Sequence, residues 1–267
     1  DDLIIDYDVP TYGKEHIGAV WGKAVGCTVA EHAGHTVREW LEGETVAILG
    51  GGPSLTQAQV DACRGRVRVI AINTAYQLAP WADMVYFCDE AWYGWHRDAK
   101  AFKSFAGLKV ALQNARTWVY DASVKVIENY GGPPEHAGLC EVRDGVYTGR
   151  NSGNQAMQLA AHLGARRMLL LGFDMRAEGA RTHWHMSHQR PTAPQDFAVQ
   201  MLPWFPALKA ELDGRGIEVL NCTPGSALTT FPTATVERAL ELVLAEKASA
   251  LEGAEARRRE QYFFRTV

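Results

Sequence analysis

Short apolar runs that end at a glycine, an asparagine or an aspartate recur along the middle of this chain. The clearest lie at Thr45–Leu49, Arg68–Ile72, Met84–Cys88 and Arg167–Leu171, with weaker ones at Leu108–Leu112 and Ile217–Leu220. Strands that are apolar throughout are buried on both faces, as in a parallel sheet covered by helices. The pattern therefore predicts an α/β protein with a Rossmann-like, mostly parallel sheet and helices on both faces.

Segments with helical character separate these runs. The expected helices are Thr56–Cys63 with Thr56 as its N-cap, Asn154–Leu163, Phe197–Leu212 with breaks at Pro203 and Pro206, and a long charged helix at Thr235–Arg259. We expect three parts: an N-terminal extension over residues 1–43, a Rossmann-like nucleotide-binding and catalytic domain over 44–232, and a C-terminal helix over 233–267. Within the extension, the sequence favours an extended stretch at Leu3–Tyr7 and a helix at Ala30–Leu41.

Composition excludes several classes of protein. With 47% hydrophobic and 22% charged residues, the chain matches neither a disordered nor a collagen-like protein. A net charge of −4 gives no global attraction to nucleic acid. The five cysteines are scattered and form no C-x-x-C pair, which favours ordinary thiols in a reducing cytoplasm. No apolar run reaches the roughly 18–20 residues of a membrane span, and the first residues lack a signal peptide's basic region, so we expect a cytoplasmic protein.

Polar residues follow several of the predicted strands. The glycine loop Gly50–Ser54, Asn73, Asp89 and Asp174 each lie at or just past a strand end. Open parallel sheets bind ligands in the crevice beyond the carboxyl ends of their strands. The sequence therefore predicts that these residues converge on one site.

The loop GGGPSL after the first strand matches neither the dinucleotide fingerprint nor the P-loop. Glycines permit close approach of the backbone, and amides that face the start of a helix favour phosphate. The loop thus suits nucleotide binding through Gly51, Gly52, Pro53 and Ser54, with a plain strand-to-helix turn as the alternative.

A second loop, Gly149–Gly153, opens the helix that precedes Arg167–Leu171. It offers Arg150 as a cation and free amides at a helix N-terminus, with Asn151 or Ser152 as the N-cap. Two such loops suit a phosphorylated ligand held between them. For a single loop, capping of the helix is a sufficient explanation.

Three histidines, His183, His185 and His188, lie within six residues of one polar loop. Imidazole serves as acid, base or metal ligand near neutral pH. The H-x-H-x-x-H spacing partly resembles the metallo-β-lactamase run, with Ser187 where that pattern has aspartate. Catalysis or substrate binding, metal ligation and a solvated histidine-rich loop are all open.

Carboxylates and aromatic residues offer further candidates. Asp89, Glu90 and Asp174 suit Mg²⁺ or a ribose hydroxyl, or act as solvated caps. An aromatic group either stacks on a base or sugar or packs a sheet edge; its members are Trp81, Tyr86, Trp92, Tyr93 and Trp95.

Three segments carry a resemblance to known families: GGGPSL, INTAYQLAPWADMVYFCDE and TGRNSGNQAMQLAAHLGARRMLLLGFDM, followed by the histidine loop and Asn221–Pro224. Over about residues 44–232 they look like a group of phage-encoded proteins. More remotely, the order of motifs is similar to single-domain bacterial sialyltransferases and to pterin diphosphokinase-like proteins of Rossmann-type fold. Those families share a G-x-G-P-S-L loop, an asparagine after the second strand, a Ser/Thr-Ser-Gly helix start and a G-x-D strand end.

The sialyltransferase resemblance implies roles for particular residues. Gly52, Pro53 and Ser54 would lie near the donor's phosphate and ribose, and Asn73 would bind the nucleotide. The opposite wall would consist of Arg150, Ser152 and Gly153. A loop histidine, His188 first and His183 next, would deprotonate the acceptor hydroxyl. The sequence departs from the family in its short loop, in the acidic Asp89–Glu90 pair and in lacking the relatives' phosphate-binding tyrosines near Asp174.

Together these observations predict a glycosyltransferase-like enzyme. It would take a nucleotide-activated donor and transfer a sugar to a hydroxyl of a glycan, a small metabolite or a modified DNA base, with His188 as general base and no required cofactor. Arg150 and the helix amides would stabilise the departing phosphate.

Three alternatives stay open. One is a diphosphokinase-type or nucleotide-hydrolysing enzyme with Mg²⁺ or another divalent ion on Asp89 and Asp174. Another is a nucleotide-sequestering protein or phage assembly factor without catalysis, in the bacterial host's cytoplasm. The third is a metal-dependent hydrolase built on His183, His185 and His188. A homo-oligomer is also open.

Overall fold

The computed structural model describes residues 40–113, 121–131, 138–141, 145–185 and 192–263. The predicted stretch at Leu3–Tyr7 and most of the predicted helix at Ala30–Leu41 lie outside these ranges. Side chains of residue 251 and of residues 253–263 are likewise outside the description.

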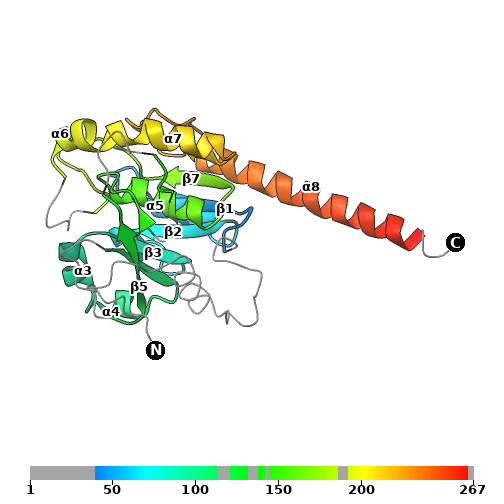
Figure 1. Ribbon diagram of the computed structural model, residues 1–267, viewed down its shortest axis with the longest axis horizontal. Helices are drawn as coiled ribbons and strands as arrows, with labels where there is room; N and C mark the ends of the chain where they lie inside the picture. The colour runs from blue at the N-terminus through cyan, green and yellow to red at the C-terminus, as the bar shows by residue number, and fades with distance from the viewer. Residues whose placement is uncertain (1–39, 114–120, 132–137, 142–144, 186–191, 264–267) are drawn as a thin grey trace.

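One parallel sheet forms the centre of the molecule (Figure 1), and its strand order is β6-β5-β4-β3-β2-β1-β7-β8. The strands are β1 (Thr45–Leu49), β2 (Arg68–Ile72), β3 (Met84–Phe87), β4 (Leu108–Leu112), β5 (Val124–Asn129), β6 (Gly145–Val146), β7 (Arg167–Leu171) and β8 (Glu218–Asn221). Every paired neighbour is parallel, which confirms the predicted Rossmann-like α/β class. The order reverses between β1 and β7, so the crevice expected of such sheets lies at their carboxyl ends.

Helices cover both faces of the sheet, because alternate residues of each strand point to opposite sides. The helical elements are α2 (Gln57–Cys63), η2 (Asn73–Gln77), α3 (Glu90–His96), α4 (Lys100–Lys103), α5 (Ser152–His162), α6 (Pro194–Asp196), the π-helix η4 (Phe197–Met201), η5 (Leu202–Trp204), α7 (Phe205–Gly214) and α8 (Val236–Phe263). On one face, Ile48 of β1 belongs to the same apolar core as residues of α5 and α7. On the other, Leu49 shares a core with α2, α3, α4 and the start of α8.

Most predicted elements are present, with small shifts at their ends. Thr56 caps α2 in a capping box with Gln59, as predicted. The helix expected over Phe197–Leu212 is broken into η4, η5 and α7 around its two prolines. Of the two predicted N-caps of α5, Asn151 and Ser152, the structure has Asn151, whose Oδ1 accepts from the Asn154 amide at 2.8 Å.

Strands β5 and β6 and helices α3 and α4 did not emerge from the sequence pattern. Charged residues such as Lys125 and Glu128 interrupt the apolar run of β5, and β6 has only two residues. Both lie toward one edge of the sheet, where continuous burial is not required.

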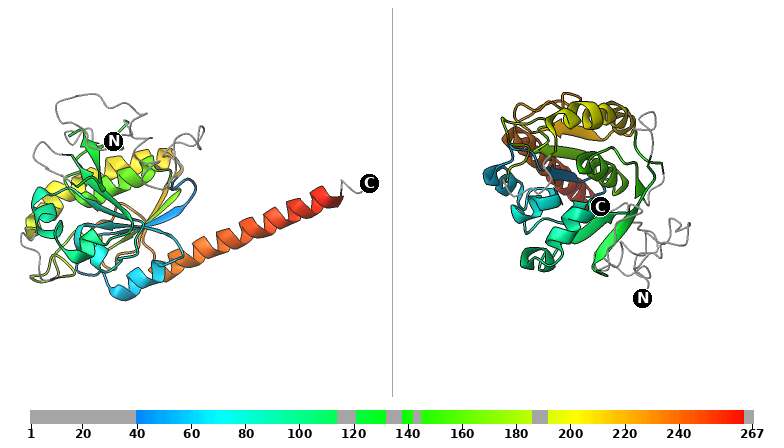
Figure 2. Two further views of the ribbon diagram at one scale, coloured as in Figure 1. Left: turned by 90° about the horizontal axis from the view of Figure 1, so that it is seen from below. Right: turned by 90° about the vertical axis from the view of Figure 1, so that its left-hand side faces the viewer.

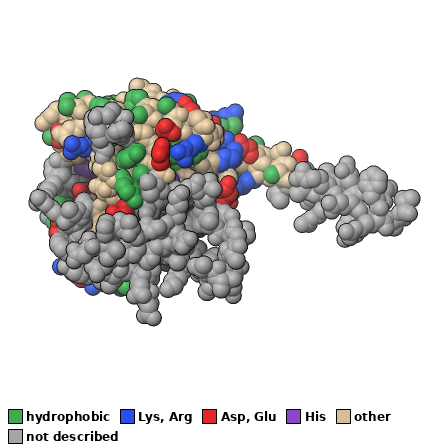
Figure 3. Space-filling view, in the orientation of Figure 1, with side chains coloured by type: hydrophobic (Ala, Val, Ile, Leu, Met, Phe, Trp, Pro, Cys, Tyr) green, Lys and Arg blue, Asp and Glu red, His purple; other side chains and the backbone are tan. Residues whose placement is uncertain are grey.

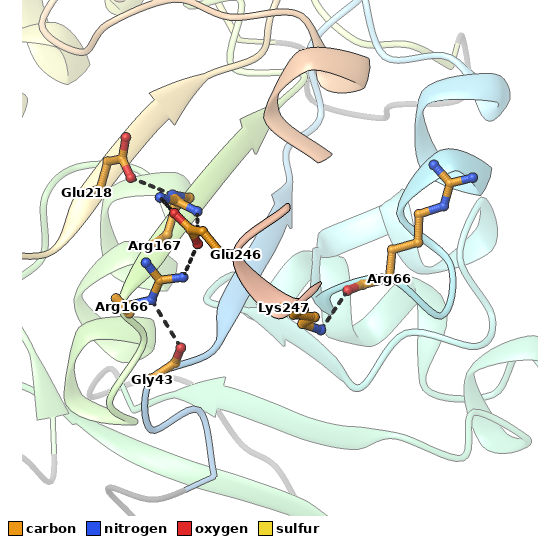
Figure 4. A network of polar contacts seen from close by, with 7 residues as sticks. All are labelled: Gly43, Arg66, Arg166, Arg167, Glu218, Glu246 and Lys247. Atoms are coloured by element: carbon orange, nitrogen blue, oxygen red, sulfur yellow. Dashed lines mark hydrogen bonds and ion pairs between the residues drawn. The ribbon is translucent and has the colours of Figure 1, made fainter. Parts of the chain in front are cut away.

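An ion-pair network anchors the first half of α8 to the sheet (Figure 4). Arg167 in β7 has a side chain only 6% exposed and donates to Glu218 at 2.5 Å and to Glu246 at 2.8 and 2.9 Å. Arg166 also donates to Glu246, and Lys247 donates to the Arg66 carbonyl at 3.1 Å. These arginines lower the pKa of Glu246 to about 2.

Beyond this anchor, α8 projects away from the domain in each view that shows its length (Figures 1 and 2). Acidic and basic side chains gather where it leaves the domain (Figure 3). None of the helices in the described ranges is long and apolar enough to cross a membrane.

Replacing Glu246 with alanine should lower the free energy of unfolding by about 1–3 kcal/mol, because the largely buried Arg167 loses one of its two carboxylate partners. Urea denaturation measures this change. The matched control is Glu241→Ala on the same helix, whose partner Arg238 is 66% exposed; it should cost less than about 0.5 kcal/mol. Equal losses in the two variants would contradict the anchoring role.

Candidate functional site

A cavity of about 490 Å³ lies at the carboxyl ends of β1, β2, β3 and β7. It is lined by most of the predicted site residues, namely Gly51, Gly52, Asn73, Asp89, Arg150, Asn151, Ser152, Gly153, Asp174, His183 and His185. Pro53 and Ser54 do not line it, although Ser54 bonds to a residue that does. His188 lies outside the described residues. The structure thus brings together the two loops and the start of the histidine segment.

The glycine turn Gly50–Gly52 lies directly against the turn that follows β7. The Gly50 amide donates to the Leu171 carbonyl and the Gly52 amide to the Gly172 carbonyl, each at 2.8 Å. A Cβ on Gly50 would lie 2.5 Å from the Gly172 oxygen, and one on Gly52 would overlap the Asp174 carboxylate. Glycine is needed here because of this close approach.

Asp174 strengthens the contact between the glycine turn and the turn after β7. Its side chain accepts from the Ser54 amide at 3.2 Å and from the Ser54 hydroxyl at 2.9 Å. Asp174 is 2% exposed. Burial raises the pKa of Asp174, and the hydrogen bonds from Ser54 partly oppose that rise. The carboxylate therefore joins the two strand-end turns as well as lining the cavity.

Gly52→Ala should destabilise the protein by about 1–3 kcal/mol, because the added methyl group forces the two turns apart. The control is Gly94→Ala in α3, where a Cβ meets nothing within 4 Å and a helical alanine is favoured. Thermal unfolding of both variants gives the measurement. A Gly52→Ala protein as stable as Gly94→Ala would show that the close contact is not maintained in solution.

The N-terminus of α5 forms the facing wall. Ser152 hydroxyl lies 3.0 Å from the Cys88 sulfur, and Phe173 packs so closely beneath Gly153 that a Cβ there would lie 2.6 Å from its ring. The amides of Ser152, Gly153 and Gly51 have no acceptor among the residues described. Unpaired amides at a helix N-terminus and in a glycine turn favour an anion.

Buried amide side chains of α5 hold the loop before it. Gln155 donates to the Thr148 carbonyl, and Gln158 accepts from the Tyr147 amide at 2.9 Å. Gly149 has φ +51°, and any Cβ there would overlap Asn154. Arg150 of this loop lines the cavity.

Three non-glycine residues have left-handed backbone in the described part of the chain: Asn73 (φ +50°), Arg150 (φ +55°) and Met175 (φ +49°). All three line the cavity, and they follow β2, precede α5 and follow β7 respectively. This conformation costs free energy in L-residues and clusters at functional sites. The left-handed backbone at these three residues therefore points to a functional site, and this evidence is independent of the sequence motifs.

Two buried polar atoms of cavity-lining residues have no hydrogen-bond partner among the described residues. They are the acceptor Oδ1 of Asn73 and the donor Nε1 of Trp184. Buried polar atoms are almost always paired, so each such atom needs an explanation. A bound ligand with complementary groups supplies one.

The histidine segment sits over the glycine turn. The Trp184 amide donates to the Gly51 carbonyl at 3.0 Å, and the His183 ring contacts the position of a Gly51 Cβ at 3.3 Å. Thr182 Oγ1 lies 2.9 Å from His183 Nδ1, which orients that ring. The ring centroids of His183 and His185 are 5.8 Å apart.

Aromatic residues of α3 form a further wall. Trp92 and Trp95 line the cavity, and Trp92 donates to Thr74 Oγ1 at 3.0 Å. His96 stacks on Trp92 with centroids 4.2 Å apart, and burial, with a smaller contribution from His185, lowers the pKa of His96 to about 4.

The other predicted aromatic residues lie elsewhere. Tyr86 is buried and donates to Gln155 at 3.1 Å, Tyr93 stacks on Phe87, and Trp81 lies under Arg64. For these three, packing is the explanation.

Sequence reasoning missed three residues near this site: Met175, Arg176 and His96. Met175 and Arg176 directly follow the G-x-D turn, so their position after a strand end was the available signal. His96 is one helical turn from Trp92, a spacing that placed it on the same helix face.

No group of three His, Cys, Asp or Glu side chains within the described residues is arranged to hold a metal ion. A site built on His183, His185 and His188 stays a prediction, since His188 is outside the description. Cys88 lines the cavity, but burial raises the pKa of its thiol to about 12, so it is not a ready nucleophile.

No family model and no curated protein matches the chain. The sialyltransferase CstII from Campylobacter jejuni, solved with the substrate analogue cytidine-5'-monophosphate, is similar at 13% identity and a TM-score of 0.48, over 73% of this chain and 86% of that one. A short-chain dehydrogenase from Oenococcus oeni PSU-1 is similar at 13% identity and a TM-score of 0.25, over 76% and 89% of the two chains.

These identities and TM-scores are too low for either likeness to bear on function. The predicted resemblances to phage-encoded and pterin diphosphokinase-like proteins stay predictions.

Proposed function

We propose that this protein is a glycosyltransferase-like enzyme that binds a nucleotide-activated sugar in the strand-end cavity and transfers the sugar to a hydroxyl acceptor. The observation that carries the proposal is the shared cavity itself: the glycine turn, the N-terminus of α5, Arg150 and two histidines line one space.

The donor's phosphate is the group best suited to the space between Gly51 and Ser152. The unpaired amides of Gly51, Ser152 and Gly153 and the charge of Arg150 all favour an anion there. The same groups stabilise the negative charge that develops on the departing nucleotide, a large contribution in group transfer.

The nucleoside part suits the wall formed by Asn73, Trp92 and Trp95. Asn73 Oδ1 is a buried acceptor without a described partner, ready for an N–H or O–H of the ligand. The Trp95 indole is suited to stacking on a base or sugar ring. Trp92, which is 3% exposed and stacked on His96, completes the wall by packing.

A histidine of the loop would take the proton from the acceptor hydroxyl as the new bond to the sugar forms, so that the nucleotide leaves with its bonding electrons. Among the described residues, His183 is the best placed, because it lines the cavity and Thr182 orients its ring. His188, which the sequence analysis favours as the general base, is the other candidate. A positioned base typically contributes about 10²–10⁴-fold to the rate.

The test combines ligand binding with transfer. In a thermal-shift screen of nucleotides and nucleotide sugars, with and without Mg²⁺, we expect sugar nucleotides to raise the melting temperature. Asn73→Gly should weaken that binding at least tenfold, because it removes the amide but keeps the left-handed backbone. His183→Ala and His188→Ala should bind the donor normally, and one of them should lose about 10²-fold or more of the transfer rate.

Three outcomes would count against the proposal. Hits confined to nucleotides that are cleaved or phosphorylated only with Mg²⁺ would favour the diphosphokinase-type or hydrolase alternative, with Asp89 and Asp174 near the metal. A ligand bound tightly and left intact, with both histidine variants unaffected, would favour a sequestering protein. Binding to no nucleotide at all would remove the proposed donor.

A further inference from the structure

Arg176 is a cation of the cavity with no role in the proposed transfer. It follows Asp174 by two residues, at the start of the loop after β7, and it lines the cavity. Its neighbour Met175 has the strained left-handed backbone that turns the chain at this point. The backbone turn at Met175 therefore directs the chain so that Arg176 lines the cavity.

The backbone of the loop after β8 holds the Arg176 guanidinium in place. Its Nε donates to the Gly225 carbonyl at 2.7 Å. Gly225 has φ +61°, and a Cβ there would lie 3.1 Å from Arg176 Nη2. Glycine at this position allows both the turn and the close approach of the arginine.

The loop that holds Arg176 is itself fixed to the G-x-D turn. Thr223 Oγ1 accepts from the Phe173 amide at 2.9 Å, Ser226 donates to the Phe173 carbonyl at 2.5 Å, and the Ala227 amide donates to the Asp174 carbonyl at 2.8 Å. Two strand-end turns thus form one unit that positions a single guanidinium. Such preorganisation reduces the entropy lost on binding a ligand.

Most of the guanidinium's hydrogen-bonding capacity is unused. Arginine has five N–H donors, and the one at Nε is the one bonded to Gly225. The Nη groups make no hydrogen bond or ion pair with a residue in the described ranges. The Asp174 carboxylate feels the charge of Arg176 but is hydrogen-bonded to Ser54 instead. A fixed guanidinium with open Nη donors fits a phosphate or carboxylate of a ligand.

We propose that Arg176 is a phosphate-binding residue, and that its Nη groups donate to a phosphate lodged between the loop after β7 and the glycine turn Gly50–Gly52. The assignment rests on the proposed function in that the phosphate belongs to the nucleotide-activated donor. It adds a second arginine to Arg150, from a different loop, on the path of the donor's phosphates.

The experiment measures binding of inorganic pyrophosphate to the full chain by isothermal titration calorimetry. Arg176→Gln should weaken binding about tenfold to a hundredfold, since a charge-assisted, forked contact is lost. Arg176→Lys should recover part of the affinity, because it keeps the charge without the fork. The control is Arg181→Gln on the same loop; Arg181 does not line the cavity and lies near Glu178, and its variant should bind like the wild type.

A merely structural role for Arg176 gives a different result. In that case Arg176→Gln would lower the melting temperature of the ligand-free protein and leave pyrophosphate affinity within twofold of wild type, which would overturn the proposal. Wild-type protein that does not bind pyrophosphate would overturn it too. Pyrophosphate binding that depends on Arg176 in a protein that binds no nucleotide would support this inference while the proposed function failed.

Discussion

The contact between two turns at the middle of the sheet determines the shape of the site. Gly50–Ser54 after β1 contacts residues 171–174 at the end of β7. The contact consists of two backbone hydrogen bonds, from the Gly50 amide to Leu171 and from the Gly52 amide to Gly172, and of the Ser54–Asp174 pair. These strands are neighbours at the point where the strand order reverses, so their ends border the natural crevice of the fold. No side chain on Gly50 or Gly52 is compatible with this approach.

The other walls are built outward from that contact. Phe173 packs against Gly153 at the start of α5. The Trp184 amide donates to the Gly51 carbonyl, which holds the histidine segment against the glycine turn. The loop after β8 fixes the far side through its bonds to Phe173 and Asp174. Backbone amides, arginines and imidazoles therefore face one space, and this arrangement is what an anionic, activated ligand needs.

The strands that form the centre of the sheet could be predicted because they are continuous apolar runs, and their polar end residues Asn73, Asp89 and Asp174 do meet at one cavity. The pattern failed at β5 and β6, where charges and shortness hide the strand.

The pattern also failed where tertiary contacts decide a role. Arg176 follows the G-x-D turn, but that position does not reveal its hydrogen bond to Gly225, 49 positions along the chain. His96 lies one helical turn from Trp92, but the spacing alone does not show that the two rings stack. The sequence suggests Tyr86 and Tyr93 as residues that stack on a ligand, but both pack inside the protein.

The central claim is that the amides of the glycine turn and of the α5 N-terminus bind a nucleotide's phosphate. Its most direct test is an amide proton–nitrogen NMR titration with the nucleotide that stabilises the protein most. We predict that the largest chemical-shift changes occur at the Gly51, Ser152 and Gly153 amides and at the Trp184 indole N–H. Saturable binding that leaves these four signals unmoved, with shifts at residues remote from the cavity, would contradict it.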